Sequence, residues 1–172
     1  MSGLSFRHTR KSDKEAVMKI YDDAKVYMAN SGNPDQWNGS YPDEFLIDDD
    51  IKAKRSYVCV DGGQIAAVFM LMFEDDKSYD KIYEGSWLND EPYSVIHRIA
   101  VADNMHGKGI AKACIDFCRE ECLKRGLYNL KIDTYKDNIP MQKTLTKYGF
   151  SHCGTVYVDG VLKRMGYQYV IK

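Results

Sequence analysis

Residues 95–150 decide the fold, with the sequence VIHRIAVADNMHGKGIAKACIDFCREECLKRGLYNLKIDTYKDNIPMQKTLTKYGF. The hydrophobic pattern predicts an apolar strand, a loop with two glycines, a long helix, a second strand and a short helix. The short helix is expected to begin at Asn138 and to end at the pair Gly149-Phe150. Gly107 and Gly109 fall where the loop becomes the long helix, so this junction is the first candidate for a functional site.

The glycine pair suits the binding of a pyrophosphate. Backbone without Cβ atoms can approach a ligand closely. The first N–H groups of a helix lack partners within the helix, and the helix dipole adds partial positive charge there. An ordinary tight turn between strand and helix is the alternative. A P-loop is excluded because G-x-x-x-x-G-K-[ST] is absent, and a dinucleotide fingerprint because Lys112 stands where its third glycine belongs.

The rest of the chain predicts an α/β domain with a mixed, mostly antiparallel central sheet flanked by helices. Ser12 and Glu15 have the spacing of a capping box and predict the start of the first helix. The other expected helices cover 43–55, 107–125 and a segment from 138, and the expected strands cover 6–9, 57–60, 64–73, 93–101, 127–134, 150–158 and 161–171. Residues 74–92 are expected to be irregular and either functional or mobile.

Length and composition predict one domain over residues 1–172 and exclude several function classes. The chain is 44% hydrophobic and 28% charged, with a net charge of −1. A pI of about 6.4 gives no reason to expect nucleic acid or an anionic membrane as partner. No apolar run reaches the roughly 18–20 residues that span a bilayer, and the N-terminal segment lacks the apolar region of a secretory signal. We therefore expect a cytoplasmic protein.

The five cysteines agree with a reducing compartment. Cys114, Cys118 and Cys122 recur every four residues along one predicted helix, which raises the question of a metal site. No neighbouring pair of ligands has zinc spacing, and free cysteine is often buried as a small apolar residue. The prediction is that these three, and Cys59 and Cys153 in strands, pack in the core and that no metal is bound.

The order of parts around the glycines resembles the acyl-CoA-binding core of the GNAT superfamily of N-acyltransferases. That family has an [RQ]-x-x-G-x-[GA] turn between a strand and a long helix, and residues 104–109 here are NMHGKG. Both glycines match, whereas Asn104 departs from the usual Arg or Gln. Asn138 and the Gly149-Phe150 pair match later family positions. The resemblance is specific over residues 95–157, about a third of the chain.

The resemblance implies that the fourth and fifth strands splay apart and that acyl-CoA enters the gap between them, within a CoA-binding core at about 93–158. Acetyl-CoA is the expected acyl donor. Main-chain groups of the fourth strand would pair with the pantetheine, and backbone N–H groups of the turn would hold the pyrophosphate. The implied cofactor-binding residues are Ile99, Ala100, Val101, His106, Gly107, Lys108, Gly109, Ile110, Ala111, Asn138 and Met141.

His97 is the candidate general base. An alkylamine must lose a proton before it attacks, and a histidine titrates near neutrality. Strand alternation predicts that His97 shares a face with Val95, Ile99 and Val101. Arylalkylamine acetyltransferases of this superfamily also carry a histidine four residues before the end of this strand. The alternative is a histidine that only hydrogen-bonds a neighbour and supports the fold.

The acceptor and the proton donor to the leaving thiolate are less defined. A family tyrosine seven residues after the helix-opening Asn corresponds to Leu145 here, so water, Tyr135 or Tyr148 would have to serve. Aromatic and acidic residues that could bind an amine come mostly from the two irregular segments. They are Trp37, Tyr41, Tyr83, Glu84, Trp87 and Asp133, although aromatics also fill gaps and acids also face water.

The resemblance therefore implies an N-acetyltransferase that moves the acetyl group of acetyl-CoA to a primary amine of a small molecule by direct attack. Asn104 and Leu145 leave open a catalytically inactive domain that senses acyl-CoA or binds a partner. A structural or nucleic-acid-binding module has no basic patch or motif to support it. A homodimer through the closing strands is plausible because exposed sheet edges tend to be covered.

Overall fold

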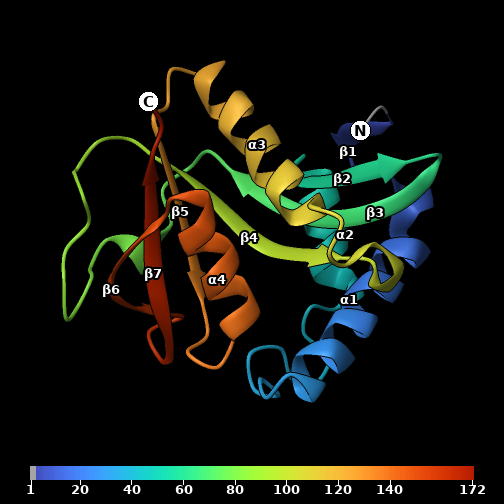
Figure 1. Ribbon diagram of the computed structural model, residues 1–172, viewed down its shortest axis with the longest axis horizontal. Coiled ribbons are helices and arrows are strands. Elements are labelled where there is room, and N and C mark those ends of the chain that lie inside the picture. Colours follow the sequence, from blue (N-terminus) through green and yellow to red (C-terminus); the bar gives the residue numbers. More distant parts are fainter. Residues whose placement is uncertain (1–2) are drawn as a thin grey trace. The chain divides into compact units, whose positions relative to one another are not determined.

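The computed structural model describes residues 3–172. Its helices are α1 (Lys14–Asn30), α2 (Glu44–Lys52), α3 (Ile110–Leu123) and α4 (Ile139–Tyr148), with short 3-10 turns η1 (Lys11–Asp13), η2 (Lys77–Tyr79) and η3 (Asp103–Met105) (Figure 1). Its strands are β1 (Leu4–His8), β2 (Ser56–Asp61), β3 (Gln64–Met72), β4 (Ser94–Val101), β5 (Asn129–Thr134), β6 (Ser151–Val158) and β7 (Leu162–Val170).

The predicted fold class is confirmed. The seven strands follow the order β1-β2-β3-β4-β5-β7-β6. The pairs β1–β2, β2–β3, β5–β7 and β6–β7 are antiparallel, and β4–β5 is parallel. The contacts divide the chain into two compact units, each discontinuous in sequence, with the boundaries after Leu71, His97 and Phe117.

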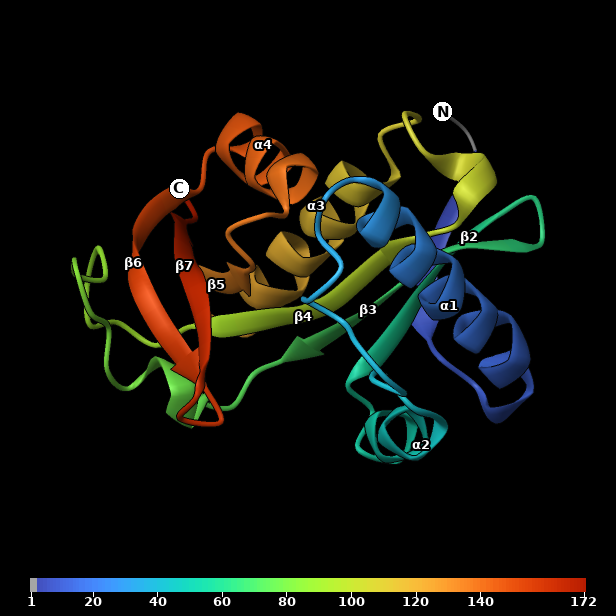
Figure 2. The same ribbon diagram turned by 90° about the horizontal axis from the view of Figure 1, so that it is seen from below.

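The first unit contains residues up to 71 and residues 98–117. Its core is aromatic: the Phe6 and Phe117 rings stack with centroids 4.7 Å apart, and Phe69 packs edge-on against both. Phe117 thereby joins the middle of α3 to strands β1 and β3. Helices α1 and α2 contact each other, and α2 also contacts β2 (Figure 2).

The second unit contains residues 72–97 and 118–172. Strands β5, β7 and β6 lie side by side in Figures 1 and 2, with α4 packed against β6. The rings of Tyr148 and Phe150 meet Tyr169 on β7 at 5.2 and 5.4 Å between centroids. Leu145 is fully buried. This packing fixes the end of α4, as the Gly149-Phe150 pair predicts.

Local signals in the sequence explain where α2 and α4 begin. Asp43 caps α2 by accepting from the N–H of Leu46 at 2.9 Å, and Asn138 caps α4 by accepting from the N–H of Met141 at 3.2 Å. The predicted capping box at Ser12 is wrong. The Asp13 carboxylate instead accepts from the N–H of Arg10 and from the Arg7 guanidinium, which forms the turn η1 ahead of α1.

The segment 74–92 is irregular, as predicted, but it is fastened to the sheet. Tyr83 and Thr155 exchange two backbone hydrogen bonds of 2.8 and 2.7 Å. The N–H of Leu88 donates to Gln168 on β7 at 2.8 Å, and Asn89 donates to Asn129 on β5 at 3.0 Å. We infer that this segment is a fixed wall of the second unit.

All five cysteines are free and buried, as their core assignment predicts. Between residues 3 and 172, no group of three or more His, Cys, Asp or Glu side chains is arranged to hold a metal ion. In the same part of the chain, none of the helices combines the length and the apolar character needed to cross a membrane.

Candidate active site

Strand β4 carries His97 one residue past the end of its regular pairing with β5. The parallel register of β4 with β5 runs from Ser94↔Leu130 to Ile96↔Ile132, although both strands continue beyond it. The next residue after His97, Arg98, has a left-handed φ of +50°. A non-glycine residue in that region breaks the extended alternation. The predicted sharing of one face by His97, Ile99 and Val101 therefore does not hold past Arg98.

His97 lies between two carboxylates in the second unit. Its Nε2 is 2.8 Å from Asp76 Oδ2, and its Nδ1 is 3.8 Å from Asp133 Oδ2. The His97 and Asp76 side chains are each 19% exposed, and that of Asp133 is 9% exposed. These groups are thus partly shielded from water while still reachable, which suits proton transfer.

Asp76 is held in place before it meets His97. It precedes η2, and its Oδ1 accepts from the N–H of Ser78 at 2.8 Å. Its own N–H lies 3.3 Å from the hydroxyl of Tyr93. The hydrogen bond from His97 lowers the pKa of the Asp76 carboxyl, against the opposing effect of burial. Asp76 therefore stays ionised through the neutral range.

Asp133 is oriented by two further side chains. The Tyr79 hydroxyl donates to its Oδ2 at 2.7 Å, and Arg164 Nε lies 3.8 Å from its Oδ1. Burial raises the pKa of Tyr79 well above its ordinary value, so this hydroxyl remains a donor. Of the two predicted acidic acceptor residues, Asp133 is the one beside His97.

A buried ion pair fixes the distorted part of β4 in the first unit. The Arg98 guanidinium donates to Asp50 on α2, and these side chains are 10% and 6% exposed. The Tyr21 hydroxyl donates to the main-chain oxygen of Arg98 at 3.1 Å. The left-handed backbone at Arg98 is therefore held from its side chain and from its carbonyl.

The glycine turn, residues 104–109, has a left-handed backbone at both of its glycines. Gly107 and Gly109 have φ values of +76° and +77°, and a Cβ at either would enter open space. The predicted helix start at Gly107 is wrong, because α3 begins at Ile110 and the glycines form the turn before it. Its first N–H groups follow the turn directly, and open backbone of this kind fits an acyl-CoA pyrophosphate.

The remaining predicted cofactor residues divide between the two units. Ile99, Ala100 and Val101 end β4, and the His106 ring lies 3.1 Å from the Val101 carbonyl oxygen and 4.6 Å from the Tyr27 ring. The N–H groups of His106 and Lys108 make long bonds of 3.4 Å within the turn. The predicted residues of the first unit are Ile99, Ala100, Val101, His106, Gly107, Lys108, Gly109, Ile110 and Ala111, while Asn138 and Met141 open α4 in the second.

The six predicted acceptor residues have different surroundings. Trp37 packs edge-on against Tyr21, and Tyr41, 42% exposed, lies 3.4 Å from an Arg98 nitrogen. In the second unit, the Trp87 indole donates to the Tyr79 main-chain oxygen at 2.9 Å. Glu84 accepts from Thr155 at 2.7 Å, which points to a structural contact on the surface. Trp87 and Asp133 thus join the surroundings of His97 through Tyr79.

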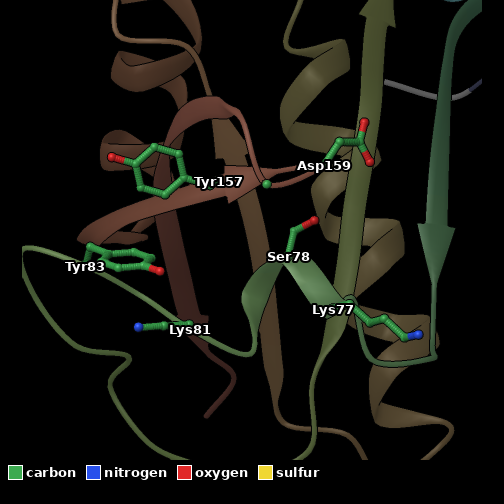
Figure 3. Close-up of a pocket in the computed structure, with 7 residues that line it drawn as sticks. Lys77, Ser78, Lys81, Tyr83, Tyr157 and Asp159 are labelled. Atoms are coloured by element: carbon green, nitrogen blue, oxygen red, sulfur yellow. The ribbon is translucent and has the colours of Figure 1, made fainter.

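A pocket of about 650 Å³ opens elsewhere in the second unit, between η2 with its following loop and the turn from β6 to β7 (Figure 3). Its lining residues are Lys77, Ser78, Lys81, Tyr83, Tyr157, Asp159 and Gly160. The Tyr83 and Tyr157 rings meet edge to face at 5.3 Å. Of the predicted acceptor residues, Tyr83 alone lines this pocket.

Lys131, a buried lysine of the second unit, was not predicted from the sequence. Lys131 is 3% exposed, and its ammonium lies 4.1 and 3.8 Å from the ring centroids of Trp87 and Tyr93. Burial lowers its pKa from 10.5 to about 8. A charged group between two apolar residues of β5, Leu130 and Ile132, is the signal that could have identified it.

Lys131→Met is expected to raise the free energy of unfolding at pH 7 by about 1–3 kcal/mol. The substitution removes the cost of burying a charge, at about 1.4 kcal/mol for each pKa unit, and the loss of the cation–π contacts offsets part of this gain. A depressed pKa means that the unfolded chain keeps the proton longer, so wild-type stability rises with pH between about 8 and 10. Urea unfolding at pH 7, 8, 9 and 10 measures this. The difference in the free energy of unfolding between Lys131→Met and wild type should shrink as the pH rises. For the exposed control Lys143→Met, this difference should not change with pH. If Lys131→Met is no more stable than wild type at pH 7, the prediction is wrong.

Comparison with known proteins places these features in one family. Residues 15–150 match the model of the acetyltransferase (GNAT) family. The streptothricin acetyltransferase of Escherichia coli is 28% identical over 98 residues, which is 57% of this chain and 55% of that protein, so the match spans about half of the relative's length.

Solved structures of other proteins have a similar fold. A GNAT-family acetyltransferase from Streptococcus agalactiae has a TM-score of 0.88 at 30% identity, over 99% of this chain and 97% of that one. A Salmonella typhimurium protein solved with its cofactor acetyl-CoA shares the fold, with a TM-score of 0.69 at 14% identity over 99% and 95% of the two chains. With most of its length matched by the family model, this chain belongs to the GNAT family of acetyltransferases.

Proposed function

We propose that the protein is an acetyl-CoA-dependent N-acetyltransferase whose acceptor is a primary amine of a small molecule. The observation that carries the proposal is the open glycine turn, with φ near +76° at both glycines, at the start of α3 in a chain of this family. The second support is His97, which lies between Asp76 and Asp133. We further propose that this is one acyltransferase domain acting in the cytoplasm, with which five free cysteines agree.

Acetyl-CoA would supply the acetyl group as a thioester. On this proposal, N–H groups of residues 106–111 hold the pyrophosphate, main-chain groups of Ile99, Ala100 and Val101 pair with the pantetheine, and Asn138 and Met141 lie along it. An N–H near Val101 would face the thioester oxygen and stabilise its developing negative charge.

At the acceptor end, Asp133 would attract the amine in its cationic form, and His97 would take a proton from it. Trp37, Tyr41, Tyr83, Glu84 and Trp87 complete the proposed acceptor residues. Leu145 is fully buried and offers no hydroxyl, and Tyr148 packs on Phe150 and Tyr169. Proton donation to the leaving thiolate is therefore assigned to water or Tyr135, and a thiol with a pKa of about 8.5 leaves tolerably without an acid.

The identity of the amine is open to a screen. The E. coli relative is named for streptothricin, so this compound belongs in a panel with polyamines, amino acids and aminoglycosides. Release of the CoA thiol reports turnover for every member of the panel. A proposed homodimer would use β6, the last strand in the sheet order.

The first test is calorimetric titration of acetyl-CoA and CoA into the wild type and into Gly107→Glu. Glutamate at this position places a side chain and a negative charge in the space reserved for the pyrophosphate, so we expect affinity to fall at least about tenfold. Gly32→Glu is the matched control, because Gly32 also has a positive φ of +84° and open space for a Cβ.

Wild-type binding that survives in Gly32→Glu but not in Gly107→Glu supports the donor site. No binding to the wild type, or equal binding to both variants, contradicts it.

A further inference from the structure

The contacts of His97 determine more than its presence in the site. Asp76 is ionised at neutral pH and can only accept hydrogen bonds, so the proton of a neutral His97 lies on Nε2. Nδ1 is then the unprotonated nitrogen. It points toward Asp133 Oδ2 at 3.8 Å, a separation too long for a direct hydrogen bond.

We propose that Asp76 is a positioning residue that makes Nδ1 of His97 the base, and that the acceptor binds as an ammonium between Nδ1 and Asp133 Oδ2. This inference rests on the proposed acetyl transfer. Because the two atoms are 3.8 Å apart, a nitrogen atom to one side of the line that joins them can be about 2.8–3.0 Å from both at once. Asp133 Oδ2 already accepts one bond from Tyr79 and retains a lone pair for the ammonium.

The charges around His97 favour an ammonium over a neutral amine. Asp133 has Arg164 as its cation, at 3.8 Å, whereas the ion-pair partner of Asp76 within residues 3–172 is His97 itself. With neutral His97 the four groups Asp76, Asp133, Arg164 and His97 carry one net negative charge. A bound ammonium brings the total to zero. Partly buried groups of one net sign favour such a counter-charge.

Proton transfer from the ammonium to His97 leaves this total charge at zero. The ammonium gives one proton to Nδ1, and the imidazolium that forms has Asp76 as its counter-ion. The amine nitrogen forms its bond to the thioester carbonyl carbon as the C–S bond breaks. The second proton leaves the new amide nitrogen for the thiolate or water, and His97 returns its own proton to solvent. No other reactant is needed.

Asp76→Asn separates this role from a structural one. The amide can donate to Nε2, which moves the imidazole proton to Nδ1 and blocks the base, so we expect kcat to fall about 10²-fold or more. KM for acetyl-CoA should stay within about twofold, because the glycine turn is untouched. Asp75→Asn makes the same chemical change at an exposed neighbour and should keep wild-type kcat.

A second readout does not depend on turnover. The ¹⁵N chemical shifts of the His97 ring report which nitrogen carries the proton, and we expect Nε2–H in the wild type and Nδ1–H in Asp76→Asn. A wild type with the proton on Nδ1 overturns the inference even if acetyl transfer is observed. Equal kcat in the two Asn variants overturns it as well. Absence of turnover in every protein would refute the proposed function, while the wild-type tautomer would still decide the role of Asp76.

Discussion

His97→Ala is expected to lower kcat about 10²- to 10⁴-fold, the range that general base catalysis contributes. The imidazole lies between Asp76 and Asp133, and alanine leaves no ring nitrogen beside Asp133 to receive a proton. Affinity for acetyl-CoA should be unchanged, because residues 106–111 keep their backbone geometry. Steady-state kinetics with the best amine of the screen and calorimetry with acetyl-CoA measure the two quantities.

His152→Ala is the control. His152 belongs to the same unit, bonds the Gly154 carbonyl at 3.1 Å and packs against the Tyr167 ring. If His97→Ala and His152→Ala both keep wild-type kcat, His97 has no part in the reaction. Loss of acetyl-CoA binding in His97→Ala would instead indicate a structural role. The selective loss of kcat is the result that identifies a base.

The parts of this fold that sequence predicts are those set by neighbouring residues. The turn Asp61-Gly62-Gly63 joins β2 to β3, and Asn138 caps α4, because their signals need only a few adjacent residues. The glycine turn belongs to the same class. Its left-handed backbone follows from the lack of a Cβ at Gly107 and Gly109.

The surroundings of His97 could not be predicted in this way. Asp76 and Tyr79 reach His97 and Asp133 across 21 and 54 residues of sequence, and no local pattern encodes such a contact. One signal was available: Asp76-Lys77-Ser78 has the spacing with which an aspartate caps a short turn. It could have shown that Asp76 is ordered, although not that it faces a histidine.

Arg98 marks the other limit of sequence analysis. A strict alternation was expected along β4, yet a buried charged residue such as Arg98 has to find a partner or distort the strand. Arg98 does both: it pairs with Asp50 and adopts a left-handed φ of +50°. The charge was visible in the sequence, whereas its partner, 48 residues away, was not.

Asp50→Ala is expected to lower the free energy of unfolding by about 3–5 kcal/mol, the cost of leaving one member of a buried ion pair without the other. Arg98 is 10% exposed, and its remaining contacts are a 3.4 Å approach to the Tyr41 hydroxyl and a contact with Met70 sulfur. Neither neutralises the guanidinium. Urea unfolding should give a midpoint far below that of the control Asp49→Ala, which alters the exposed neighbour on α2.

The double variant Asp50→Leu/Arg98→Met separates stability from geometry. Removing both charges should restore most of the lost stability, because apolar pairs often replace buried ion pairs without penalty. It should not restore activity. A left-handed non-glycine residue costs about 1–2 kcal/mol, and the guanidinium that holds Arg98 in that conformation is gone. Since β4 runs on from His97 through Arg98 to Val101, relaxation at residue 98 changes the direction in which the main chain leaves His97. A stable double variant with wild-type kcat would show that the ion pair serves stability alone; a stable variant with reduced kcat would show that Asp50 acts on the reaction through the backbone of β4.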